Sequence, residues 1–104
     1  MNKFEIKITE SAEKDLFEIG NYIAKELLEL EIARKNVYEI GQAILSLEEM
    51  PLRNKLVDDE RLALQGVRKI LINNYIVFYI VTEEDKIVTI IRILYGKRNW
   101  VNLI

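Results

Sequence analysis

The C-terminal segment, residues 87–104, holds the side chains of this chain that are best suited to chemistry. Arg92 is the single charged residue in a run of β-branched and other aliphatic residues that predicts a strand. It is followed by Tyr95, Lys97, Arg98 and the only tryptophan, Trp100. A guanidinium stays charged in proteins, and burying it without a partner costs several kcal/mol. Arg92 must therefore face water or an anion. A strand arginine followed by a tyrosine and two cations is suited to gripping a phosphate.

The composition excludes other kinds of site. The 104 residues include no cysteine and no histidine, which removes disulfides, thiolate zinc sites and the commonest general base. No apolar run approaches the roughly 20 residues of a membrane span, and the N-terminus lacks the apolar region of a signal peptide. The acidic run at residues 58–60 indicates a solvated loop rather than a cation site. We therefore expect one domain, residues 1–104, in the cytoplasm, without metal, cofactor or membrane contact.

Charge is divided unevenly along the chain, whose net charge is −2. Residues 1–60 carry eight Lys/Arg against fourteen Asp/Glu, whereas residues 61–104 carry seven against three. The acidity of the whole chain argues against nucleic acid as a ligand, and this split weakens that argument. The alternative explanation is that basic residues at strand margins serve solubility.

The N-terminal half predicts a strand and two helices. Residues 3–8 alternate between charged and apolar side chains, as a half-buried strand does, and Thr9 then offers a helix N-cap. Two apolar stripes of helical spacing follow, and Pro51 ends the second. One helix over residues 10–49 would be a rod of about 60 Å, too long for a domain of this size. We therefore predict a helical hairpin that breaks near Leu28–Glu31.

The C-terminal half predicts a three-stranded meander after a loop or irregular turn at residues 52–66. The strands are expected at Val67–Ile72, Tyr75–Thr82 and Ile87–Tyr95, with Asn73-Asn74 as a two-residue turn. If Ile72 pairs with Tyr75 and Thr82 with Ile87, Val77 is expected opposite Arg92. These registers place a set of residues on one exposed face, expected to bind a partner: Arg68, Ile70, Tyr75, Val77, Tyr79, Ile90 and Arg92. The helical hairpin is expected on the other face, which holds Leu71, Ile76, Phe78, Ile80, Ile91 and Ile93.

The expected fold is α+β: an N-terminal strand, a helical hairpin packed on one face of an antiparallel sheet (β-α-α-β-β-β), and a short C-terminal tail. Distinctive residues occur along this order of elements: Phe4–Thr9, Ala12, Asp15-Leu16, Pro51, Gly66-Val67-Arg68, Tyr75, Val77, Tyr79 and Arg92–Trp100. Together, the order and these residues resemble the RelE/ParE superfamily of bacterial type II toxin–antitoxin toxins. The resemblance covers essentially the whole chain, and the tail is most similar to the ParE-like, plasmid-stabilisation branch.

The resemblance implies roles for individual residues. In the ribonuclease members, strand arginines clasp the scissile phosphate, which here implies Arg68 and Arg92 as catalytic residues. Tyr95 falls where relatives carry a proton-transferring residue, although strict alternation puts it on the face opposite Arg92. Further contacts to RNA or another target are expected from basic residues of the loop and tail: Arg53, Lys55, Arg61, Lys97 and Arg98. The chain is thus a candidate metal-independent endoribonuclease.

Alternatives remain open at this point. A single strand arginine is more often a solvated charge than a phosphate ligand, and Tyr95 is as well explained by packing on Trp100. A toxin of this superfamily acts either by cleaving mRNA, on the ribosome, or by inhibiting DNA gyrase, and a cognate antitoxin neutralises it. The alternative function is a non-toxic or decayed interaction module that keeps the fold.

Overall fold

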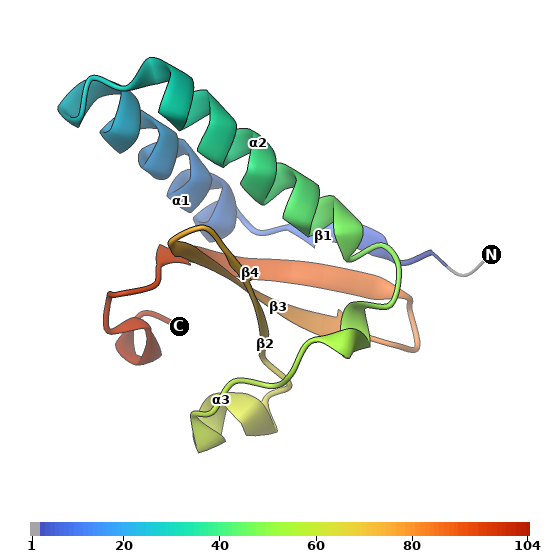
Figure 1. Ribbon diagram of the computed structural model, residues 1–104. Coiled ribbons are helices and arrows are strands. Elements are labelled where there is room, and N and C mark those ends of the chain that lie inside the picture. Colours follow the sequence, from blue (N-terminus) through green and yellow to red (C-terminus); the bar gives the residue numbers. More distant parts are fainter. Residues whose placement is uncertain (1–2) are drawn as a thin grey trace.

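The computed structural model describes residues 3–104, which form a helical hairpin on one side of a four-stranded sheet (Figure 1). After strand β1 (Glu5–Ile8), helix α1 (Glu10–Asn21) continues into a π-helical turn, Tyr22–Glu26, and helix α2 (Leu30–Ser46) runs back beside it. The remaining elements are a 3-10 turn (Pro51–Arg53), helix α3 (Glu60–Leu64), strands β2 (Arg68–Ile72), β3 (Tyr75–Thr82) and β4 (Ile87–Tyr95), and a 3-10 turn (Trp100–Asn102).

Thr9 starts helix α1, as predicted. Its Oγ1 accepts a hydrogen bond from the backbone N–H of Ala12 at 3.2 Å and donates one to the carbonyl oxygen of Ile90 at 2.9 Å. Glu10 and Glu13 lie in the first turn, where the helix dipole favours negative charge. Because one hydroxyl serves both the helix and strand β4, it fixes where α1 leaves the sheet.

The hairpin breaks at Leu28, which confirms the predicted turn. Leu28 has φ of 55° and is 83 % exposed, so a leucine holds the left-handed conformation that a glycine would usually take. The N–H of Glu29 bonds to the carbonyl of Ile23 at 3.1 Å and closes the turn. Tertiary packing of the two apolar stripes therefore outweighs the local backbone cost.

The sheet has the order β1-β4-β3-β2, with β1 parallel to β4 and the other pairs antiparallel. The predicted hairpin registers are confirmed, since Ile72 pairs with Tyr75 and Thr82 with Ile87. Strand β1 ends at Ile8, opposite Ile90, so the C-terminal half of β4 has no strand beside it on that edge. This free half-edge is where the charged cluster described below lies.

A β-bulge in β4 makes one predicted pairing wrong. Arg92 pairs with Phe78, not with Val77, because the register shifts between Phe78 and Tyr79 and leaves Ile91 without a partner in β3. An extra residue in one strand moves every later side chain of that strand to the other face. Arg92 therefore lies on the face opposite Arg68, and the prediction that the two arginines share a face is wrong.

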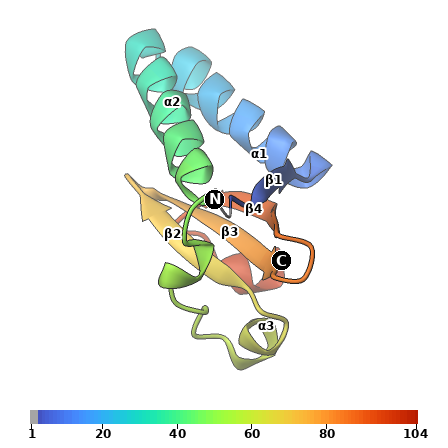
Figure 2. The ribbon, with the colours of Figure 1, turned by 90° about the vertical axis from the view of Figure 1, so that its right-hand side faces the viewer.

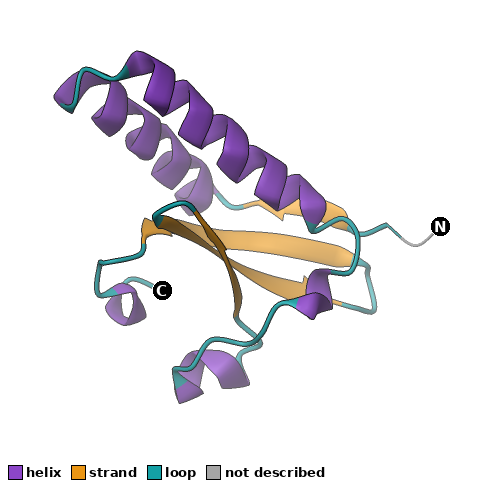
Figure 3. Ribbon diagram, viewed as in Figure 1, coloured by secondary structure: helices purple, strands orange, loops and turns teal. Residues whose placement is uncertain are grey.

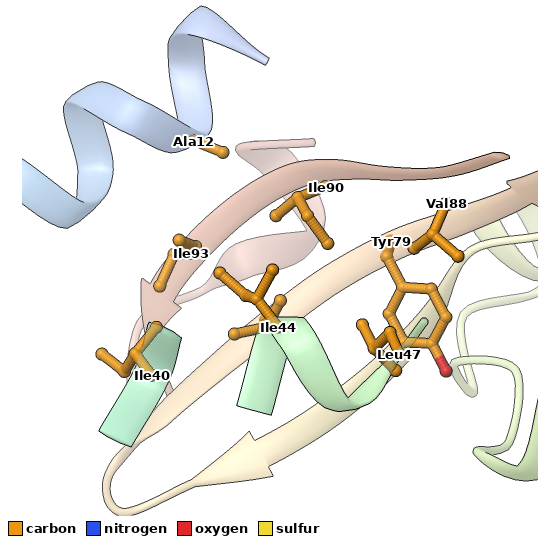
Figure 4. Close-up of a cluster of buried hydrophobic side chains, with 9 residues drawn as sticks. Ala12, Ile40, Ile44, Leu47, Tyr79, Val88, Ile90 and Ile93 are labelled. Atoms are coloured by element: carbon orange, nitrogen blue, oxygen red, sulfur yellow. The ribbon is translucent and has the colours of Figure 1, made fainter. Parts of the chain in front are cut away.

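The helical hairpin covers the face that we expected to be exposed (Figures 2 and 3). We call it the helix face; its fully buried strand residues are Val77, Tyr79, Val88, Ile90 and Ile93. Figure 4 shows Tyr79, Val88, Ile90 and Ile93 against residues of the two helices and of the turn after α2: Ala12, Ile40, Ile44 and Leu47. The predicted choice of face was wrong because both faces of β3 are equally apolar, so alternation alone contained no information on which face meets the helices.

The opposite face, here called the outer face, is also covered. Its residues Ile76, Phe78 and Leu94 form a second core with Val57, Leu62 and Val67 from the segment between α2 and β2. Helix α3 lies within that segment, for which the sequence predicted a loop. Asp59 caps this helix by accepting a hydrogen bond from the N–H of Leu62 at 3.0 Å. Because both faces are packed, the sheet presents no open apolar arginine face.

Candidate functional site

Arg92 is held by an ion pair inside the molecule. Its Nε and Nη2 donate to the two carboxylate oxygens of Asp15, at 2.7 and 2.8 Å, and its Nη1 donates to the carbonyl oxygen of Leu103 at 2.8 Å. Asp15 is 8 % exposed and also accepts from the backbone N–H of Ile93 at 2.9 Å. The hydrogen bonds to Asp15 raise the pKa of Arg92. This fork-to-fork geometry neutralises the guanidinium without any external anion.

Asp15 was among the residues that match the family, but no role was predicted for it, although a signal for one exists. It lies three residues after Ala12 and four before Ile19, so it is an acid on the buried stripe of α1. It completes the sheet where β1 has ended, because its carboxylate takes the strand N–H that a neighbouring strand would otherwise accept. A buried acid on one element and a lone strand arginine on another indicate such a pair.

Arg68 has a different set of partners. Its Nη1 donates to the carbonyl oxygen of Asn54 at 2.6 Å and approaches that of Leu52 at 3.5 Å. The hydroxyl of Tyr79 donates to the carbonyl of Pro51 at 2.6 Å and accepts from Asn54 Nδ2 at 3.0 Å. Burial raises the pKa of Tyr79 above 10. Arg68 and Tyr79 therefore hold the chain segment after α2 against the edge of the sheet.

Tyr95 does not pack on Trp100. It lies opposite Tyr75 in the sheet, with ring centroids 5.8 Å apart in an edge-on arrangement, whereas Trp100 packs on Phe78 with centroids 4.9 Å apart. Tyr95 lies on the face opposite Arg92, as alternation predicted. Burial, with smaller contributions from Tyr95 and Tyr22, raises the pKa of Tyr75. Tyr95 is thus a member of a tyrosine cluster and is separated from both strand arginines.

These tyrosines line a groove of about 680 Å³. It lies between the turn of the helical hairpin, the start of β3 and the end of β4. We call it the tyrosine groove. Its wall includes one cation, Arg98, and two acids, Asp15 and Glu18. The other lining residues are Ile19, Tyr22, Ile23, Leu27, Ile32, Asn36, Asn74, Tyr75, Ile93, Leu94 and Tyr95. Apolar walls with a few polar groups are typical of binding sites.

The remaining predicted site residues do not gather at one place. Arg53 donates to the carbonyl of Glu49 at 3.0 Å and to Ser46 Oγ at 3.3 Å, and Arg61 donates to the carbonyl of Val101 at 3.3 Å. Lys55 and Lys97 are exposed, and only Tyr95 and Arg98 of the predicted set line the groove. The structure thus brings together Tyr95 with Arg98, and separates Arg68 from Arg92.

Residues 3–104 contain neither a cluster of metal ligands nor a membrane-spanning helix. No three His, Cys, Asp or Glu side chains of this part of the chain are grouped as ligands for a metal ion. None of its helices has both the length and the apolar character that crossing a bilayer requires.

Comparison with known proteins agrees on one family. Residues 6–100 match the family model described as the ParE toxin of the type II toxin–antitoxin system, parDE. No curated protein has a significant sequence match. Among solved structures, the chromosomal ParDE system of P. aeruginosa is similar with a TM-score of 0.75 and 22 % identity, covering 93 % of this chain and 100 % of that one.

Two further structures extend the similarity to RelE proteins. The RelBE2 toxin–antitoxin complex of Mycobacterium tuberculosis gives a TM-score of 0.66 at 20 % identity, covering 91 % of this chain and 93 % of that one. A mutant of E. coli RelE in the free state gives 0.67 at 17 % identity, covering 97 % and 92 %. At these identities the similarity concerns the fold.

Proposed function

The chain belongs to the ParE family of type II toxin–antitoxin toxins, and on that premise we propose that it stops growth by binding a protein target, DNA gyrase, without cutting RNA. The observation that carries this proposal is the ion pair between Arg92 and Asp15. A phosphate could use Arg92 only after two charge-assisted hydrogen bonds had been broken, and Asp15 would then be left without its partner.

The positions of the other candidate catalytic groups support the same proposal. RNA cleavage requires one site that removes a proton from the 2′-hydroxyl, stabilises the phosphorane and protonates the leaving oxygen. Arg68 is directed to the backbone of Asn54, and Tyr95 lies on the face opposite Arg92. The chain has no histidine. Side chains placed in this way do not converge on one phosphate, whereas a surface that binds a protein needs no such convergence.

We assign the tyrosine groove to the antitoxin. The groove continues into an exposed apolar patch at the hairpin turn, where Leu27, Leu28 and Ile32 are each about half exposed or more. Tyrosines and exposed aliphatic residues around a concave surface are typical of protein-binding sites. Arg98 offers a charge partner for a carboxylate. The proposed occupant is an antitoxin segment that folds on binding, with apolar anchors and an acidic side chain near Arg98.

Induced expression in bacteria, with separate readouts for gyrase and RNA, tests the mode of action. We expect growth arrest with gyrase-dependent DNA breaks, inhibition of supercoiling by purified gyrase, and intact mRNA on ribosomes. Cleaved mRNA together with normal supercoiling would overturn the proposal in favour of a ribonuclease. A folded chain that leaves growth unaffected would indicate the non-toxic interaction module.

A pair of tyrosine variants tests the groove. Tyr22→Ala should weaken antitoxin binding about tenfold or more, because it removes a groove anchor. Tyr38→Ala is the matched control, since Tyr38 is 65 % exposed on α2 and does not line the groove. Titration calorimetry with the cognate antitoxin measures both variants. Equal losses in the two variants would place the antitoxin elsewhere.

A further inference from the structure

The C-terminal segment crosses the outer face of the sheet; we call residues 97–104 the strap. Trp100 packs on Phe78 with ring centroids 4.9 Å apart, and Lys69 Nζ lies 5.7 Å from the centroid of the Trp100 ring. Leu103 and Ile104 pack against the same core. The strap thus places one large aromatic side chain and two aliphatic side chains on an apolar surface, as a bound peptide would.

Two arginines hold the backbone of the strap. Arg92 Nη1 donates to the carbonyl oxygen of Leu103 at 2.8 Å, and Arg61 Nη2 donates to that of Val101 at 3.3 Å in an exposed position. Arg92 is itself oriented by Asp15, whose carboxylate binds its other two nitrogens. A side chain of α1 therefore positions the guanidinium that holds the far end of the strap.

The chain reaches the outer face through Gly96. The N–H of Gly96 donates to the carbonyl oxygen of Asn74 at 2.8 Å, and an added Cβ would lie 3.3 Å from that same oxygen. Beyond Gly96, the strap has no strand pairing. Its hydrogen bonds between backbone groups are local, such as that from the N–H of Leu103 to the carbonyl of Trp100 at 2.9 Å. A segment held by half-buried side chains and local bonds opens at lower free energy than a paired strand.

We propose that the strap occupies a peptide-binding surface, which becomes available when the strap opens. The surface consists of Phe78, Leu94 and Ile76, with Lys69 and Arg92 at its margin. It takes a peptide segment with one large aromatic residue, aliphatic residues after it, and a carbonyl or carboxylate oxygen that binds Arg92. In the closed protein, Trp100, Leu103 and its carbonyl fill these positions. The inference does not depend on gyrase being the target.

The full-length Trp100→Ala variant tests the proposal, because it removes the main anchor of the strap and the only tryptophan. The probe is a fluorescently labelled synthetic peptide with the sequence of residues 97–104. Its fluorescence anisotropy measures binding. We expect the peptide to bind Trp100→Ala and not the wild type. Adding Arg92→Lys to Trp100→Ala should weaken binding about tenfold, because lysine cannot keep both Asp15 and the peptide carbonyl. Arg34→Lys in the same background is the matched control and should leave binding unchanged, because Arg34 is an exposed residue of α2 that pairs with Glu31.

Each other outcome overturns the proposal. If Trp100→Ala keeps its circular dichroism but does not bind the peptide, the outer face is no binding surface. If the wild type binds the peptide as tightly as Trp100→Ala does, the strap does not compete for that surface. Should Trp100→Ala not fold, hydrogen exchange of the wild type decides: we expect residues 98–104 to exchange faster than β3 and β4. Exchange of the strap only with global unfolding would show that it does not open.

Discussion

The two faces of the sheet are covered in different ways. On the helix face, two long helices bury the strands, and Leu47, Ile40 and Ile90 are fully inaccessible to solvent. On the outer face, a five-residue helix, irregular loops and the strap do so, and Leu103 and Ile104 are only half-buried. From this comparison we expect the helix face to contribute more to the stability of the fold than the strap does on the outer face. Variants that affect one face and not the other test this difference.

The largest difference should come from two leucines, one packed on each face. Leu47→Ala removes a fully buried side chain from the helix face and should lower the free energy of unfolding by about 3 kcal/mol. Leu103→Ala removes a half-buried side chain of the strap and should cost less than about 1 kcal/mol. Urea denaturation with unchanged m-values measures both. Similar losses in the two variants would mean that the outer face is as important for stability as the helix face.

The ion pair at the free edge of β4 connects the two faces and should come second. Asp15→Ala leaves Arg92 without its carboxylate and Ile93 without an acceptor for its N–H. We expect a loss of about 2 kcal/mol, less than for a fully buried pair because the Arg92 side chain remains 25 % exposed. Glu18→Ala, one helical turn away, should change stability by less than about 0.5 kcal/mol. A similar loss in Glu18→Ala would indicate an effect on the helix and not on the pair.

A smaller, pH-dependent effect is expected at Tyr79. The pKa of Tyr79 is raised in the folded protein, so the folded state keeps the phenol proton that the unfolded chain loses near pH 10. The resulting stability is fully present below pH 10 and is lost as the pH rises through the folded pKa. Urea midpoints from pH 8 to 11 should therefore fall more steeply for the wild type than for Tyr79→Phe. Parallel curves would show that the Tyr79 proton makes no contribution.

The smallest effect should come from Tyr95→Phe. Tyr95 lines the tyrosine groove and is 39 % exposed, and phenylalanine keeps the ring contact with Tyr75. Stability should change by less than about 0.5 kcal/mol, and growth arrest should be the same as for the wild type. A toxin that loses its activity through this one hydroxyl would support proton transfer by Tyr95 and contradict a binding mode of action.

Much of the fold could be predicted from local patterns. The alternation at residues 3–8, the cap at Thr9, the hairpin turns and two registers all depend on neighbours in the sequence. Helix α3 was missed because five residues are too few to show helical periodicity. The parallel pairing of β1 with β4 joins segments about eighty residues apart, and no local pattern carries information about it.

The candidate site was less predictable than the fold, for a reason visible at Ile91. One unpaired residue in β4 moved the side chains after it to the opposite face of the sheet. A register that was right at Thr82 therefore gave the wrong face at Arg92. Periodicity is a cumulative argument, and a single bulge invalidates everything beyond it. The groove tyrosines, Tyr22 and Tyr75 with Tyr95, come from three elements that only the packing of the hairpin brings together.

The sequence by itself determined that this chain has one helical hairpin and a meander, and it indicated the toxin family, because these depend on residue types in a fixed order. Only the tertiary structure decided which face of the sheet meets the helices and whether Arg92 is free. Both questions depend on which segments compete for the same surface. The apolar strands could bury either face, and Arg92 could pair with any nearby anion. Because β1 ends opposite Ile90, Asp15 of helix α1 lies beside the unpaired half of β4 and binds Arg92. The charge of Arg92 is therefore neutralised inside the fold.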